Sequence, residues 1–314
     1  MITRTERPTM TTKNLKINTE RFGVSVILFA SLLWGTTGTA AALIPQVSPL
    51  AIGAFSMGVG GIMLAVFACQ TMIKDWRILT KNRLVVLGGA MALAVYPLAF
   101  YTSMRIAGIA IGTMISIATA PFFVALLERL FNKNNTIDRR WVFSVILGTI
   151  GMTILTLGKG DIEPEAEVNQ YLGVLLGVVA GFSYAIYAWA AKALIDQGVD
   201  SKSAMGSIFG LGALLLLPSL WITGDHLFES IRTTSIALYL ALIPMFIGYV
   251  CFGYGLKSVS ASKASLLTLF EPAVAAVFAL AVVNERIGAS GWLGVGLIML
   301  CLFLQSYQPK PSPS

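Results

Sequence analysis

Charged residues are scarce in this chain. Asp, Glu, Lys and Arg make up 12% of the 314 residues, whereas apolar residues make up 56%. A soluble domain carries about a quarter charged residues, because its surface must stay hydrated. The low share of charge and a mean hydropathy of +0.79 indicate that most of the surface faces lipid. The composition therefore excludes an ordinary soluble protein.

Residues that bind metals or perform catalysis are also few. The single histidine is His226, and the cysteines Cys69, Cys251 and Cys301 share no spacing motif. We therefore predict free thiols and no metal site. The sequence contains no Walker sequence or other Gly-rich phosphate loop, so we expect no cofactor. We predict that the chain is not an enzyme; the alternative, an intramembrane enzyme, would need a catalytic constellation.

Ten apolar stretches are long enough to cross a bilayer, which takes about 20 residues in a helix. Backbone groups cannot stay unpaired in lipid, so we predict ten transmembrane helices in an all-α, multi-pass protein of the bacterial inner membrane. A signal peptide cleaved near residues 39–42 is the alternative for the first stretch. The predicted spans are 22–43, 50–70, 84–103, 108–127, 141–158, 171–191, 203–223, 235–256, 264–283 and 291–307.

The basic residues predict the topology. They are scattered singly, without a basic face, so the net charge of +7 does not indicate a nucleic-acid partner. Cytoplasmic loops carry an excess of Lys and Arg. With the N-terminus in the cytoplasm, only four of the 22 basic residues fall outside, namely Arg105, Lys159, Arg232 and Arg286. We therefore predict that both termini are cytoplasmic.

The chain repeats itself with a period of about 150 residues. Pro121 and Pro272, and likewise Trp141 and Trp292, are 151 residues apart. Each half then holds five helices, and an odd number inverts the second half relative to the first. Inverted repeats are typical of secondary transporters. The predicted parts are a cytoplasmic tail (1–21), a first repeat (22–158), an external acidic linker (159–170), a second repeat (171–307) and a cytoplasmic tail (308–314).

These patterns resemble a known family. Leu33-Trp34-Gly35, Thr119-Ala120-Pro121 and the run from Pro272 to Ala276, followed by Asn284-Glu285-Arg286, are similar to the drug/metabolite transporter superfamily, EamA type. Within it the chain resembles the YddG-type exporters, which implies export of aromatic and other neutral amino acids. The chain departs from the family at Lys133-Asn134-Asn135, where the family has Gly-Glu-Arg.

Glu271 is the ionisable residue predicted inside a span. A charge there costs about 2.5 kcal/mol or more unless it pairs, is protonated or meets water. It precedes Pro272, which removes a backbone hydrogen bond. Two interpretations stay open: Glu271 binds a substrate ammonium or carries a proton in a watery cavity, or it is a structural carboxylate that hydrogen-bonds the freed backbone.

Aromatic and hydroxyl residues near mid-depth are the other predicted substrate ligands, because a small apolar solute needs a mostly apolar site with a few polar anchors. They could instead simply pack, and Tyr101 could belong to an interfacial aromatic belt. Pro97, Pro121, Pro244 and Pro272 are the predicted hinges. The candidate ligands are Trp34, Thr37, Tyr96, Tyr101, Ser116, Thr119, Phe182, Tyr184, Tyr187, Tyr249, Phe252, Ser265, Thr268 and Glu271.

Together these features predict a secondary transporter that works by alternating access. Its expected partners are membrane lipid, a neutral amino acid and, as an open question, protons. The alternatives are another small metabolite such as a drug, a nucleotide sugar or an organic phosphate. Phosphates demand Lys or Arg in the cavity, and the predicted spans contain neither.

Overall fold

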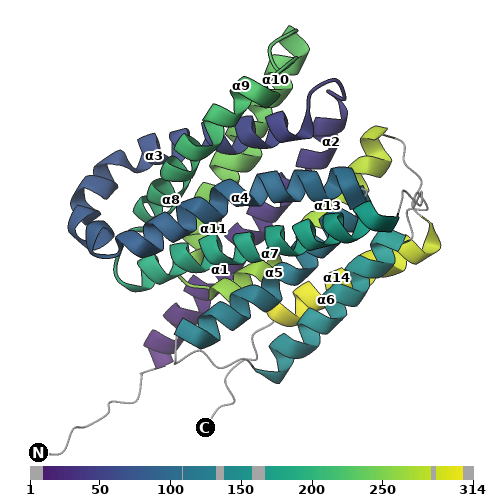
Figure 1. The fold of residues 1–314 in the computed structure, drawn as a ribbon. Helices are drawn as coiled ribbons and strands as arrows, with labels where there is room; N and C mark the ends of the chain where they lie inside the picture. Colours follow the sequence, from purple (N-terminus) through teal and green to yellow (C-terminus); the bar gives the residue numbers. More distant parts are fainter. Residues whose placement is uncertain (1–9, 108, 132–137, 158–166, 284–287, 307–314) are drawn as a thin grey trace, which may run out of the picture.

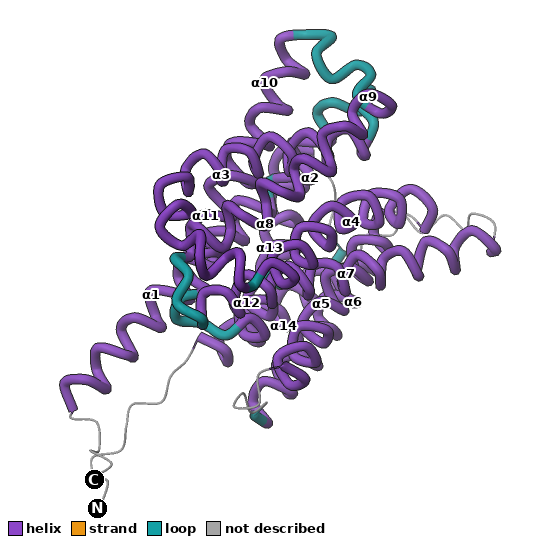
Figure 2. Tube along the Cα trace, turned by 60° about the vertical axis from the view of Figure 1, so that its left-hand side comes forward, coloured by secondary structure: helices purple, strands orange, loops and turns teal. Residues whose placement is uncertain are grey.

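The chain folds entirely into helices over the residues that the structure describes. The computed structural model describes residues 10–107, 109–131, 138–157, 167–283 and 288–306, and their regular elements are all helical (Figures 1 and 2). This confirms the predicted all-α class. Asp161, Glu163, Glu165, the stretch Lys133-Asn134-Asn135 and Glu285 lie outside these ranges.

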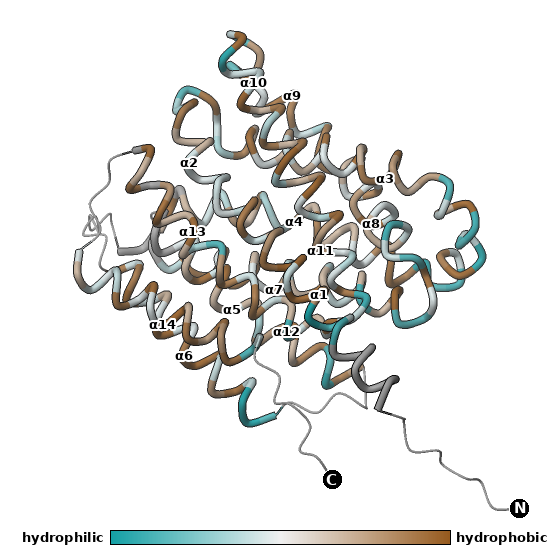
Figure 3. The backbone as a smooth tube through the Cα atoms, turned by 180° about the vertical axis from the view of Figure 1, so that it is seen from behind, coloured by the Kyte–Doolittle hydropathy of each residue, from teal (hydrophilic) through white to brown (hydrophobic). Residues whose placement is uncertain are grey.

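Ten segments of the described chain are long and apolar enough to cross a membrane, as predicted. Hydrophilic residues gather at the helix ends, whereas the middle of the bundle is largely apolar (Figure 3). The spans are Asn18–Ala42, Pro49–Lys81, Arg83–Met104, Gly112–Phe131, Arg139–Leu157, Tyr171–Asp196, Ser201–Thr223, Ile231–Leu256, Ala261–Val282 and Ala289–Ser306.

The helices of the first half are mostly continuous. They are α1 (Met10–Gly35), α2 (Thr37–Ala42), α3 (Pro49–Lys81), α4 (Arg83–Ala107), α5 (Ile109–Phe131) and α6 (Arg139–Leu157). Those of the second half are more interrupted. They are α7 (Glu167–Asp196), α8 (Ser201–Leu216), the 3₁₀ turn η1 (Leu217–Ser219), α9 (Leu220–Thr223), α10 (Ile231–Leu240), the π-helix η2 (Ala241–Ile247), α11 (Gly248–Leu256), α12 (Ala261–Leu267), α13 (Phe270–Phe278), the π-helix η3 (Ala279–Val283) and α14 (Ala289–Ser306).

Helix α3 corrects one predicted boundary. The predicted span 50–70 leaves Lys74, Arg77 and Lys81 in a loop. The helix instead runs from Pro49 to Lys81, 33 residues in all, and includes them. At 1.5 Å per residue this is about 50 Å. The Asp75 carboxylate accepts a hydrogen bond from the Asp200 amide at 2.9 Å, which fastens the end of α3 to the start of α8. The basic residues therefore lie on a continuous helix.

The two halves share one interface. α4 packs against α7 in the way that α11 of the second half packs against α1 of the first. Likewise α5 contacts α7, and α12 and α13 contact α1. The pairs α3–α8 and α6–α14 complete the arrangement. Corresponding helices of the two halves thus make corresponding contacts with the other half, as expected for repeats of opposite orientation.

Four spans of the described chain contain a break or an irregular turn; the seventh is interrupted by η1, and the other three lie near the candidate site. The first span breaks between α1 and α2, at Thr36. The eighth contains the π-helix η2 around Pro244, and the ninth breaks between α12 and α13, directly before Glu271 and Pro272. Pro97 and Pro121, by contrast, lie inside the continuous helices α4 and α5. Breaks and π-turns free backbone groups, and such irregular backbone is tolerated at membrane depth where protein or water satisfies it.

Candidate functional site

Aromatic side chains from both halves meet in the middle of the bundle. The aromatic cluster consists of Trp34 (α1), Tyr96 (α4), Tyr184 and Tyr187 (α7), Phe209 (α8), and Tyr249 and Phe252 (α11). Ring centroids are 4.8 Å apart for Trp34 and Tyr249, 5.0 Å for Tyr184 and Tyr187, and 4.3 Å for Phe209 and Tyr249. Six of its members were predicted from the sequence, and Phe209 was not. Rings at these separations attract one another beyond the burial of their area.

Two hydrogen bonds fix the orientation of the cluster. The hydroxyls of Tyr187 and Tyr249 lie 3.0 Å apart, and both side chains are buried. The indole N–H of Trp34 donates to the carbonyl of Pro244 at 2.9 Å. That carbonyl belongs to η2, so the irregular turn of the eighth span is tied to α1. Gly248 makes room for this contact, since a Cβ there would lie 2.7 Å from Trp34 Nε1.

The tyrosine pair gives a measurable prediction. Tyr187→Phe should destabilise the protein by about 1 kcal/mol or more, because it leaves the Tyr249 hydroxyl buried without its partner. Tyr249→Phe should cost a similar amount. The double variant should cost less than the sum of the two, because it removes both polar groups together. Thermal unfolding of the four proteins in detergent measures this coupling, and strictly additive losses would contradict it.

Glu271 lies at the edge of this cluster. It occupies the first turn of α13, and its amide donates to the Thr268 carbonyl at 2.9 Å. The carboxylate is within electrostatic range of the hydroxyls of Tyr96, Tyr101, Tyr184 and Tyr249. It forms no side-chain hydrogen bond with the described residues and is half-buried. Glu271 therefore points toward the bundle interior, and the described backbone does not hold its carboxylate.

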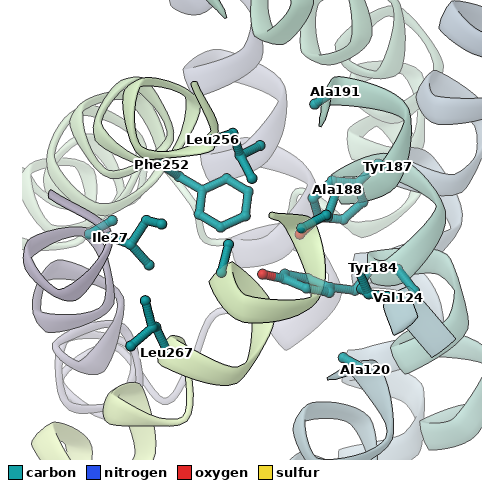
Figure 4. Close-up of a cluster of buried hydrophobic side chains, with 14 of the residues drawn as sticks. Ile27, Ala120, Val124, Tyr184, Tyr187, Ala188, Ala191, Phe252, Leu256 and Leu267 are labelled. Carbon is teal, nitrogen blue, oxygen red and sulfur yellow. The ribbon is translucent and has the colours of Figure 1, made fainter. Parts of the chain in front are cut away.

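The central side chains differ in exposure. We call the side where α1 begins and α14 ends the terminus side. Thr37, Tyr96, Tyr101 and Glu271 are half-buried. By contrast, Ile27, Tyr187, Phe252 and Leu256 are exposed by 1% or less and gather in one cluster of buried side chains (Figure 4). Phe209 is equally buried. The core around the half-buried side chains is thus tightly packed.

The predicted hydroxyl ligands bond to their own helices. Ser116 donates to the Gly112 carbonyl at 2.8 Å and Thr119 to Ile115 at 2.7 Å. Ser265 donates to Ser262 at 3.0 Å, Thr268 donates to Ser265 at 2.7 Å, and Thr37 donates to Trp34. Each oxygen can still accept a hydrogen bond. Their place beside the cluster is compatible with substrate contact.

Two predicted residues lie apart from the cluster. Phe182 is 41% exposed and contacts Phe123 edge to face, with ring centroids 5.2 Å apart. It shares an exposed face of α7 with Leu175, seven residues earlier, so it faces outward and we do not retain it as a ligand. Tyr101 contacts Phe100 and covers Gly53 rather than stacking on the other rings.

A second intramembrane carboxylate corrects the prediction that Glu271 is alone. Glu128 lies in the span Gly112–Phe131, one residue beyond the predicted end, and is 3% exposed. Its Oε1 accepts a hydrogen bond from the Ala261 amide at 2.7 Å, at the start of α12. A carboxylate favours the positive end of a helix dipole. The predicted span ended at residue 127, four residues before α5 ends at Phe131, and therefore left Glu128 out.

Two halves of five helices that enclose a polar-lined aromatic interior define a polytopic membrane transporter. The chain belongs to the EamA-like transporter family, which it matches over residues 21–157 and again over 171–307. It is 34% identical to the uncharacterised transporter YwfM of Bacillus subtilis, over 90% of this chain and 93% of that one. It is 24% identical to the uncharacterised inner membrane transporter YicL of Salmonella typhimurium, over 92% of this chain and 97% of that one.

A solved crystal structure of a protein also has this fold. It matches with a TM-score of 0.74 and 15% identity, over 90% of this chain and 95% of that one. At this identity the likeness shows the fold alone. With the ten spans and the transporter relatives, the protein is a multi-pass protein of the inner membrane.

Proposed function

We propose that the protein exports neutral amino acids, aromatic and other apolar ones, from the cytoplasm by alternating access. The observation that carries this proposal is the composition of the interior: an aromatic cluster beside one carboxylate, Glu271. Aromatic faces suit apolar side chains and attract an ammonium group. A carboxylate completes a site for the ammonium of a zwitterion.

The same interior argues against phosphate-bearing solutes. None of the cluster residues or their hydroxyl neighbours is Lys or Arg. Phosphate recognition relies on such groups. Nucleotide sugars and organic phosphates are therefore the competing substrates that an assay should include.

The irregular turns of the spans support alternating access. The breaks at Thr36 and before Glu271, with the π-helix at Pro244, are the places where the halves would bend. We assign the hinge role to Pro244 and Pro272, which lie at these irregular turns.

Counterflow in proteoliposomes tests the proposal. Labelled phenylalanine or leucine should enter vesicles preloaded with the same unlabelled amino acid, saturably and well above empty vesicles. A nucleotide sugar should neither exchange nor compete. Repeating the assay with a pH gradient shows whether protons take part. Folded protein that exchanges no neutral amino acid would overturn the assignment, and exchange of a nucleotide sugar would replace it.

A further inference from the structure

A polar cavity lies on the terminus side, apart from the aromatic cluster. It measures about 290 Å³ and is found where α1, α5, α6, α12 and α14 meet. No member of the aromatic cluster lines it. Its charged and amide lining residues are Glu20, Glu128, Asp138, Arg140, Lys263 and Gln305. Small-molecule pockets begin at about this size.

Both signs of charge face this cavity. Three carboxylates and two basic groups line it, and Lys263 Nζ lies 2.7 Å from Glu20 Oε1. Asp138 accepts a hydrogen bond from the Trp141 amide at 2.7 Å, while Glu128 holds the start of α12. A dianion would be repelled by three carboxylates. A molecule with one ammonium and one carboxylate finds an opposite charge for each end.

Gln305 provides an independent indication of a ligand. Its side chain is 6% exposed and lines the cavity, and Nε2 has no hydrogen-bond partner among the described residues. A buried amide donor without an acceptor costs about 1–3 kcal/mol, so such groups are uncommon. An acceptor oxygen placed in the cavity beside Lys263 would satisfy it.

Buried hydroxyl residues of the ninth span lie between the cavity and Glu271. Ser262 lines the cavity, and its carbonyl accepts from Ser265. The Thr268 hydroxyl donates to the Ser265 carbonyl, and the Glu271 amide donates to the Thr268 carbonyl. Glu271 follows Ser262 by nine residues, across the break between α12 and α13. Polar groups thus continue from the cavity to the carboxylate of the aromatic site.

We propose that this cavity is a second binding site, in which the zwitterionic head of the transported amino acid is held on its way to the aromatic cluster. This rests on the proposed function. The substrate carboxylate bonds to Lys263 and Gln305, and its ammonium bonds to Glu20. The substrate thereby replaces the Glu20–Lys263 ion pair. Because that pair joins α1 of the first half to α12 of the second, binding loosens this contact between the halves.

Trp141 offers a local readout. It lines the cavity, and its indole N–H donates to the Ser262 carbonyl at 3.3 Å. Protein labelled with 5-fluorotryptophan is placed in nanodiscs, and Trp141→Phe identifies the ¹⁹F signal of residue 141. The probes are leucine and two analogues that each lack one charge, 3-methylbutylamine and 4-methylpentanoate.

Leucine should move the Trp141 signal saturably, and neither analogue should do so at the same concentration. Lys263→Gln should weaken the leucine effect by about tenfold, the value of one charge-assisted hydrogen bond. Lys257→Gln is the matched control, because Lys257 pairs with Asp200 on the same side of the bundle but does not line the cavity. The shift should persist in Glu271→Gln, which separates this cavity from the central site.

Counterflow on the same preparation distinguishes the two proposals. Exchange without a Trp141 shift overturns the second site and leaves the transport function intact. A leucine shift without exchange keeps the zwitterion site and overturns the transport function. The Trp141 signal could instead move when phosphatidylethanolamine replaces phosphatidylglycerol in the nanodisc and stay in place when leucine is added. That result assigns the cavity to a lipid headgroup and overturns the proposal.

Discussion

Glu271→Gln is expected to lower amino acid counterflow by at least about tenfold at low substrate concentration. The change keeps the shape of the side chain and removes the carboxylate beside the aromatic cluster. A charge-assisted hydrogen bond is worth about 1.5–3 kcal/mol, and 1.4 kcal/mol is a factor of ten. The fold should survive, because the carboxylate has no hydrogen-bond partner among the described residues and Gln is cheaper to bury than an ionised Glu. Counterflow of labelled leucine measures the effect.

The control and the pH series decide what Glu271 does. Glu229→Gln makes the same chemical change in an exposed carboxylate that pairs with His226, and it should exchange like the unmodified protein. If Glu271→Gln still exchanges but no longer responds to a pH gradient, the carboxylate carries a proton and does not hold the ammonium. If Glu271→Gln exchanges amino acids as fast as the unmodified protein at acidic and alkaline pH, with or without a gradient, Glu271 has only a structural role.

Gly294→Leu is expected to be the most destabilising of these substitutions. Helices α6 and α14 are in close contact here, because a Cβ on Gly294 would lie 2.5 Å from both the Gly151 carbonyl oxygen and the Leu155 amide nitrogen. Both contacts are backbone, so the helices must separate. Overpacking costs about 1–3 kcal/mol and occasionally more, and the leucine side chain adds to the first clash. Thermal unfolding in detergent should show a melting temperature several degrees lower, with less monodisperse protein.

Gly296 on the same helix is the matched control. A Cβ at Gly296 meets nothing within 4 Å. Gly296→Ala should therefore leave stability unchanged or raise it by up to about 1 kcal/mol, because alanine has the higher helix propensity. Gly294→Ala should lower stability. Equal effects at the two positions would contradict the close approach of α6 and α14.

The spans were predictable because length and apolar content suffice to define them. The ends were harder to predict. Lys74 and Arg77 lower the hydropathy of their segment without ending α3, since both residues favour helix. The same preference for apolar windows cut the fourth span short before Glu128. Hydropathy measures solvent preference, whereas a helix ends where its backbone bonding ends.

The site was predictable by residue type more than by geometry. Tyr184 and Tyr187 share the buried face of α7 with Ala188 and Ala191, and this helical spacing separates them from Phe182 on the outer face. That distinction could have been made from the sequence. The 3.0 Å pairing of Tyr187 with Tyr249 could not, because it depends on how distant helices pack. The π-helix at Pro244 is equally a tertiary feature, stabilised by the Trp34 indole from 210 residues away.

The length of α3 ties the protein to the composition of its membrane. A helix of about 50 Å exceeds the hydrocarbon thickness of about 30 Å, so its last turns stand among the headgroups. There Ile73 and Trp76 are 71% and 64% exposed, next to Lys74 and Arg77. Each basic residue gains about 1 kcal/mol near an anionic leaflet. Because Asp75 fastens α3 to α8, this attraction would act on the bundle as a whole, and acidic lipid on that leaflet should hold the protein more firmly than a neutral bilayer does.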